Sequence, residues 1–209
     1  MISINRYIPC TPMTICTNIQ KVNGAWQLPD KRKKQKGEVK MLDKKQKEEK
    51  TDLEKKVVNF LLKHKLSLVT AESCTGGLLT GRLVNISGVS ETLKAGLVTY
   101  SNKAKRKLLD VNKGTLKKYG AVSKQTAKEM VKGAALGYDA EVAVAITGIA
   151  GPDGGTEEKP VGLVYIACYA KEKVVVKEYC FKGNRQEIRE EAVEKALKLM
   201  YEWMQENYH

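Results

Sequence analysis

The 209-residue sequence has little histidine, and its cysteines follow no recognisable pattern. Its two histidines are His64, in a lysine-flanked segment, and His209, at the C-terminal end. This scarcity argues against a histidine-rich metal centre and against a Ser-His-Asp triad. The five cysteines are odd in number and include no CxxC pair, which argues against a disulfide framework or a thiolate zinc site. Any catalysis therefore has to rely on a base other than histidine.

Long apolar runs are also missing from the sequence. No stretch approaches the roughly 20 consecutive apolar residues that a membrane-spanning helix needs. Residues 6–20 lack a continuous apolar core and include two prolines, so no secretory signal is predicted. We therefore expect a cytoplasmic protein with no membrane partner.

Positive charge is in excess but unevenly distributed. The chain has 37 basic and 24 acidic residues, a formal net charge of +13. Residues 1–50 hold 12 of the basic residues and 5 of the acidic ones, and include the run KRKKQK at residues 31–36. This segment has little apolar periodicity, so we predict a disordered or loosely helical extension. A nucleic-acid-binding arm is the alternative, but no specific nucleic-acid partner is expected.

Residues 51–209 carry the alternating helix and strand patterns of one α/β domain. Helices are predicted from Thr51, near Thr75, from Ser123 and from Asn184, because capping residues precede apolar repeats of helical spacing. Strands are predicted at residues 66–73, 92–101, 141–146, 161–170 and 174–181. The last two are close enough to form an antiparallel hairpin. The expected fold has α/β layers around a mixed sheet.

The segment AESCTGG, residues 71–77, stands where a predicted strand ends and a helix is predicted to begin. A serine there projects its hydroxyl into the crevice where α/β sheets bind ligands. The backbone amides near Thr75, Gly76 and Gly77 would point at the same spot, as an oxyanion hole or a phosphate seat. The alternative is that Ser73 and Thr75 only cap the helix while the glycines pack it against the sheet.

A serine nucleophile needs a base within hydrogen-bond reach. Because histidine is scarce, lysine is the natural candidate, provided that burial or a neighbouring cation lowers its pKa from about 10.4. The segment VTYSNKAKRK, residues 98–107, offers such a crowded setting at the end of a predicted strand. Its spacing does not choose between Lys103 and Lys105, and a solvated basic turn is the alternative.

Cys74 is a rival nucleophile, because thiolates form more readily than alkoxides. Adjacent side chains of an extended segment point in opposite directions, so only one of Ser73 and Cys74 should face a pocket. The simplest interpretation of Cys74 is a small buried residue.

A glycine-rich loop, TGIAGPDGGTEEKP at residues 147–160, separates two predicted strands. It matches neither GxxxxGK[ST] nor a GxGxxG that opens a helix, so no Walker or Rossmann site is predicted. A loop of this length between core strands is more often functional than filler, which favours a ligand-binding role. The alternative is a plain Gly/Pro connector.

Five motifs together resemble the C-terminal domain of the competence/damage-inducible CinA family. In chain order they are AESCTGG, GLVTYSNKAK, GAVS, AITGIAGPDGGTEEKPVG and FKGNRQEIR, within a resemblance that runs from about Leu53 to Trp203. Members of this family include stand-alone nicotinamide mononucleotide deamidases. The resemblance implies a three-layer α/β/α fold with a mixed, mostly parallel sheet and one late antiparallel hairpin. It also implies a homodimer, because family members commonly form dimers.

The activity implied by this resemblance is hydrolysis of the carboxamide of nicotinamide mononucleotide, which gives nicotinate mononucleotide and ammonia in pyridine-nucleotide recycling. The family pattern assigns the nucleophile to Ser73 and the base to Lys105, with Tyr100 orienting the pair or the ring, and requires neither a metal nor a cofactor. Contacts with this small-molecule nucleotide are expected at Thr75, Gly76, Gly77, Asn102, Thr147, Gly148, Gly151 and Arg185. One departure is Asn184, where the family pattern has an aspartate.

Overall fold

The computed structural model describes residues 20–22, 25–27 and 53–209 of the chain, which divides into two units, Met1–Gln46 and Lys47–His209. In the first unit, β1 (Gln20–Val22) pairs antiparallel with β2 (Ala25–Gln27). These six residues lie in the segment 1–50, so the prediction of a disordered or loosely helical extension is wrong for them. The Asn-Gly dipeptide between them in the sequence is typical of hairpins and was the available signal. The rest of that prediction lies outside the described residues.

The second unit is built on a five-stranded sheet with the order β4-β3-β5-β6-β7. Strand β3 pairs parallel with β4 and β5, whereas β5–β6 and β6–β7 are antiparallel. Four strands therefore run in one direction and β6 runs against them, which confirms the mixed sheet and its late hairpin. The strands are β3 (Leu68–Glu72), β4 (Leu93–Val98), β5 (Val142–Gly148), β6 (Leu163–Ala170) and β7 (Lys173–Cys180).

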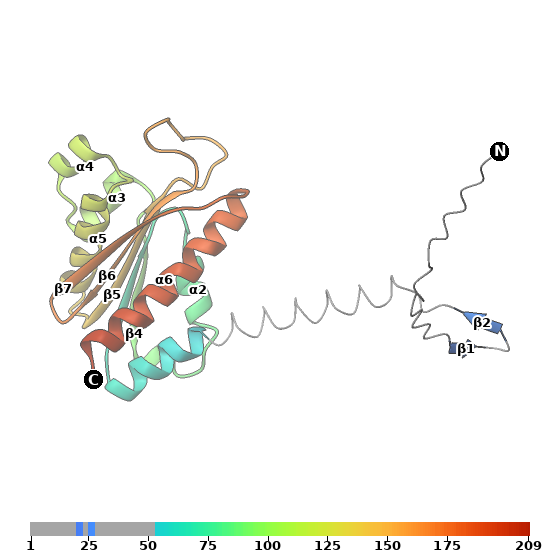
Figure 1. Ribbon diagram of the computed structural model, residues 1–209. Coiled ribbons are helices and arrows are strands. Elements are labelled where there is room, and N and C mark those ends of the chain that lie inside the picture. Colours follow the sequence, from blue (N-terminus) through green and yellow to red (C-terminus); the bar gives the residue numbers. More distant parts are fainter. Residues whose placement is uncertain (1–19, 23–24, 28–52) are drawn as a thin grey trace, which may run out of the picture. The chain divides into compact units, whose positions relative to one another are not determined.

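Helices cover both faces of this sheet, as Figure 1 shows. One core cluster joins the helix over residues 53–64, α2 and α6 to one face, and a second joins α3, α4 and α5 to the other. Alternate residues of β5 contribute to the two clusters, since Val144 belongs to the first and Ala143 to the second. The three-layer prediction is confirmed. The helices are α2 (Leu78–Leu83), η1 (Val89–Glu91), α3 (Asn102–Leu109), α4 (Lys113–Tyr119), α5 (Lys124–Gly137) and α6 (Arg185–Asn207).

The N-terminus of α6 shows that Asn184 can replace an aspartate in the late motif. The Asn184 side chain accepts hydrogen bonds from the amides of Gln186 and Glu187, and the Glu187 carboxylate accepts from the Asn184 amide. This is the predicted capping box. Asparagine and aspartate are about equally good at this position, so the departure from the family pattern leaves the turn intact.

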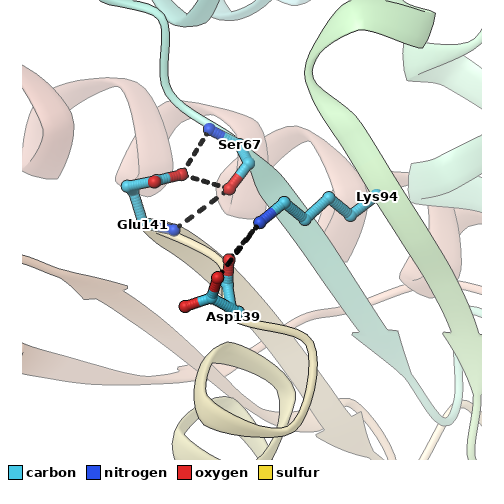
Figure 2. Close-up of polar contacts among 4 residues, drawn as sticks. All are labelled: Ser67, Lys94, Asp139 and Glu141. Atoms are coloured by element: carbon cyan, nitrogen blue, oxygen red, sulfur yellow. Dashed lines mark hydrogen bonds and ion pairs between the residues drawn. The ribbon is translucent and has the colours of Figure 1, made fainter.

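The amino ends of the parallel strands are joined by a polar cluster (Figure 2). The Glu141 carboxylate accepts hydrogen bonds from the Ser67 amide, at 2.8 Å, and from the Ser67 hydroxyl. Although desolvation opposes the effect, these bonds lower the pKa of Glu141. Lys94 of β4 donates to the Asp139 carbonyl and lies 4.0 Å from its carboxylate. The cluster ties β3, β4 and β5 together at the end opposite their carboxyl termini.

Gly133 allows α5 to approach α3, the helix that carries Lys105. A Cβ at Gly133 would lie 1.8 Å from the Leu109 carbonyl oxygen, so Gly133→Ala is expected to lower the free energy of unfolding by about 3 kcal/mol. Gly137→Ala, in the same helix, is the control, because nothing lies within 4 Å of its Cβ position. Urea unfolding of both variants measures the difference. Equal stabilities would contradict this account of the helix contact.

Candidate active site

The candidate site lies where the parallel strands β3, β4 and β5 end. Ser73 follows β3 directly, and its amide donates to the Ile146 carbonyl of β5 at 3.0 Å. The Thr99 amide, just after β4, donates to the Glu72 carbonyl at 2.8 Å. These two bonds extend the pairing between neighbouring strands to the carboxyl ends of β3, β4 and β5. Side chains from three segments that are distant in the sequence therefore meet there, as expected for an α/β sheet.

The structure places Lys105 against Ser73. Lys105 Nζ donates to Ser73 Oγ at 2.8 Å, to the Thr99 carbonyl at 2.8 Å and to the Tyr100 carbonyl at 3.4 Å. Lys105 is 1% exposed and Ser73 is 8% exposed. With Leu109, four residues later, Lys105 forms the buried side of α3, whereas Lys103 is exposed. The ambiguity between the two lysines is thus decided by the rotational phase of one helix.

Burial makes Lys105 a plausible base. Desolvation lowers its pKa from 10.5 to about 8, while the nearby Cys74 side chain acts in the opposite direction. Among residues 53–209 no carboxylate forms an ion pair with Lys105. Two causes for a lowered lysine pKa were considered from the sequence, burial and crowding by neighbouring cations. The pKa of Lys105 is lowered by burial. A substantial neutral fraction is available near pH 8.

The turn after Ser73 is shaped by Glu72, whose role the sequence analysis missed. Its side chain is fully buried, and its carboxylate accepts from the amides of Gly77, Leu79 and Thr80 at 3.0, 3.1 and 2.9 Å. The Thr80 hydroxyl adds a fourth bond at 2.7 Å. Glu72 therefore caps α2 from the preceding strand. The only sequence feature that pointed to this role is the position of Glu72, a charged residue at the end of an otherwise largely apolar strand.

Two residues predicted to form an oxyanion hole do not offer their amides to a substrate. The Gly76 amide donates to the Ser73 carbonyl at 3.1 Å, and the Gly77 amide is held by Glu72. Their φ angles of +62° and +97° suit glycine and delay the start of α2 to Leu78. The predictions that these two amides face a substrate and that the helix begins near Thr75 are therefore wrong. Thr75 itself is fully buried, and its hydroxyl has no partner among the described residues.

Arg189 of α6 holds the same turn from the other side. Its Nε donates to the Cys74 carbonyl at 3.1 Å and its Nη2 to the Thr75 carbonyl at 2.7 Å. Both bonded residues follow Ser73 directly, so the guanidinium fixes the backbone next to the candidate nucleophile. Arg189 is the last residue of the motif FKGNRQEIR, and no role was predicted for it from the sequence.

Arg185 and Tyr100 meet beside this turn. Arg185 donates from Nη1 to the Gly151 carbonyl at 2.7 Å and from Nη2 to the Tyr100 hydroxyl at 3.0 Å. Tyr100 is 61% exposed, and only its backbone carbonyl contacts Lys105. A cleft of about 550 Å³ is lined by Arg185, Arg189 and Leu78, among others. Through these two arginines the cleft is connected to Tyr100 and to the turn that follows Ser73.

Three of the expected substrate contacts lie elsewhere. Thr147 is 1% exposed and its hydroxyl donates to the Ala121 carbonyl at 2.8 Å, so in this structure it offers no accessible surface for the predicted ligand contact. At Gly148, a Cβ would lie 2.6 Å from a Val164 methyl, so close strand packing explains this glycine. Asn102 is the exposed first residue of α3 and lines a different cleft, between α3 and α4.

Cys74 is a poor nucleophile in this structure. It is 6% exposed and packs within the core cluster, and burial raises its pKa to about 11. This agrees with the interpretation of Cys74 as a small buried residue.

Cys74→Ala is therefore expected to keep any amidohydrolase activity within about threefold of the unchanged protein, because a buried thiol of raised pKa is poorly suited to act as nucleophile. Its stability should fall by about 1 kcal/mol, the usual effect of removing a small buried group. Ammonia release and urea unfolding measure the two effects. A loss of more than about 100-fold in a folded variant would instead favour a thiol mechanism.

The described residues hold no group of three or more His, Cys, Asp or Glu side chains placed to bind a metal ion. None of the helices in the described part of the chain is long and apolar enough to cross a membrane.

Comparison with known protein families matches residues 50–204 to the CinA C-terminal domain. The chain belongs to the CinA family. Two similar CinA-family relatives are named as competence-damage inducible proteins of Clostridium novyi and Clostridium tetani. The first is 51% identical over 152 residues and the second 52% identical over 145 residues, which cover 73% and 69% of this chain. In both cases the chain spans 36% of the relative's length.

Solved structures of CinA-family proteins have the same fold. The competence/damage inducible protein CihA of Agrobacterium tumefaciens is 45% identical, with a TM-score of 0.70 over 72% of this chain and 92% of that one. A CinA superfamily protein of Klebsiella pneumoniae is 32% identical, with a TM-score of 0.72 over 75% and 98% of the two chains. The family predicted from the five sequence motifs is thereby confirmed.

Proposed function

We propose that this CinA-family protein is an amidohydrolase that deamidates nicotinamide mononucleotide to nicotinate mononucleotide and ammonia. The observation that carries the proposal is the 2.8 Å contact between Ser73 Oγ and the buried Nζ of Lys105. A lysine without a carboxylate partner and with a lowered pKa is suited to accept a proton from serine. The choice of substrate rests on the family resemblance.

The proposed reaction begins with neutral Lys105, which takes the Ser73 proton as the serine attacks the carboxamide carbon. In this proposal the oxyanion is stabilised by hydrogen-bond donors other than the Gly76 and Gly77 amides, because those two are occupied within the turn. Protonated Lys105 then gives its proton to the departing ammonia. Water hydrolyses the acyl-enzyme with Lys105 acting again as base, which releases nicotinate mononucleotide and restores Ser73.

The surroundings of this pair support recognition of an anionic mononucleotide. Arg185 and Arg189 line the adjacent cleft together with one carboxylate, Glu190, so two cations against one anion stand where a phosphate could be bound. The exposed Tyr100 ring offers an apolar surface for a nicotinamide ring. In this proposal, Arg189 also positions the nucleophile through the backbone of the turn.

The test is release of ammonia from nicotinamide mononucleotide in the presence of a chelator, with nicotinate mononucleotide identified by chromatography. Folded Ser73→Ala should be inactive, and nicotinamide riboside should be a poorer substrate because it lacks the phosphate. Loss of activity on chelation would refute the metal-free mechanism. Binding without turnover by the unchanged protein would indicate a non-catalytic nucleotide-binding module instead.

A further inference from the structure

A second cleft, of about 860 Å³, lies between α3 and α4 and is lined by neither Ser73 nor Lys105. Three of its lining residues from α3 and two from α4 are cations, and Asp110 is the one carboxylate among its lining residues. The cations are Lys103, Arg106, Lys107, Lys113 and Lys117. We call this cleft the α3–α4 groove.

The positive charge of the α3–α4 groove is not neutralised by ion pairs among residues 53–209. All five cations are exposed, and none of them forms an ion pair with another residue of 53–209. The two helices present these cations to the same cleft, so like charges repel one another across it. A bound polyanion would relieve that repulsion, and the local field would draw such a ligand in.

The lining of the groove also includes two apolar residues, Val111 and Leu116. They are 2% and 9% exposed, so they offer a ligand only a small apolar surface. A ligand that suits both features carries several phosphates and a flat, largely apolar group. A single phosphate brings at most about two negative charges, fewer than five cations against one carboxylate require.

We propose that the α3–α4 groove binds a nucleoside triphosphate, with its phosphates on the cations and its base against Val111 and Leu116. This site is separate from the Ser73–Lys105 pair. The inference therefore goes beyond the proposed deamidation and does not depend on it.

The test is titration of the full chain with ATP by calorimetry, at low salt and with a chelator present. Lys103→Gln combined with Lys107→Gln should weaken binding by at least about tenfold, since two charge contacts are lost. Lys124→Gln combined with Lys128→Gln is the matched control, because it changes the same charge on exposed α5 positions and should leave affinity within about twofold.

Asp110→Asn is expected to strengthen ATP binding, whereas the lysine variants weaken it. Asp110 adopts a left-handed conformation, with φ of 51°, which asparagine accepts equally well, so the fold should be unchanged. Removing the one carboxylate should tighten ATP binding about threefold. Ser73→Ala should bind ATP as the unchanged protein does, which separates this site from the reaction centre.

Three results would overturn the proposal. One is no ATP binding at about 1 mM, well above the affinity that a specific nucleotide site should have. Another is an equal loss of ATP affinity in both double variants, which would indicate that ATP is attracted by the general charge of the surface and not by the groove. The third is binding of a single-stranded oligonucleotide that depends on Lys103 and Lys107 while ATP binding does not, which would make the groove a nucleic-acid contact.

Discussion

Lys105→Met is expected to lower kcat/KM for nicotinamide mononucleotide by at least about 1,000-fold without lowering stability at pH 7. Activity is lost because Ser73 no longer has the base that lies 2.8 Å from its hydroxyl. Methionine has a similar length and no charge, so it can fill the space that the lysine chain occupies. The change therefore separates the chemistry of Lys105 from its packing.

Stability should be retained because a charged lysine is unfavourable at this buried position. A pKa that falls from 10.5 to about 8 corresponds to about 3 kcal/mol of destabilisation at pH 7. This destabilisation is complete below pH 8, where lysine is protonated in both states. It decreases as the pH rises from about 8 to 10.5, and it vanishes above 10.5, where lysine is neutral in both. Methionine forgoes hydrogen bonds to Ser73 and Thr99, about 1 kcal/mol each, so the expected net gain is about 1 kcal/mol.

Urea unfolding at pH 7 and at pH 10.5, together with ammonia release, measures both effects. Lys128→Met is the matched control, because Lys128 is an exposed lysine of α5 that should affect neither quantity strongly. Ser73→Ala should lose as much activity as Lys105→Met with little change in stability. If folded Lys105→Met kept more than about a tenth of the activity, Lys105 could not be the base.

The second expected result is a rise of kcat/KM with pH that levels off above about pH 8. Only neutral Lys105 can accept the Ser73 proton, and its pKa of about 8 leaves about 1% of the enzyme in that form at pH 6. Between pH 6 and pH 8 the rate should therefore rise about 50-fold. Acid protonates the base, so activity falls as pH falls.

The position of the plateau distinguishes the two candidate nucleophiles. If the Cys74 thiolate carried the reaction, the rate would keep rising towards its pKa of about 11. Initial rates between about pH 6 and pH 10 at constant ionic strength measure this, with unfolding monitored at each pH. Cys74→Ala should give the same profile as the unchanged protein. A profile that is flat or falls with pH would exclude a neutral lysine base.

Much of the fold follows from local sequence patterns. The apolar run of β5 predicted a strand, and the short link between the last two predicted strands predicted the hairpin, because pairing over a short turn is a local property. Ser123 and Asn184 marked helix starts through their capping chemistry. Helix α2 begins later than expected because Gly76 and Gly77 adopt positive φ angles, which the sequence permits but does not require.

The sequence by itself determined the family, the layered α/β fold and the short group of residues from which the serine and the lysine come. Residue spacing left Lys103 and Lys105 open and the family pattern pointed to Lys105, but only the tertiary structure gives the physical reason, because the rotational phase of α3 buries Lys105 against Ser73 and exposes Lys103. It also decided that burial, not crowding, lowers the lysine pKa, because desolvation depends on all the atoms around a group. The roles of Glu72 and Arg189 became visible only in the tertiary structure. Arg189, for example, lies more than 100 residues beyond the carbonyls it binds. Such contacts depend on how helices and strands pack, which local sequence does not specify.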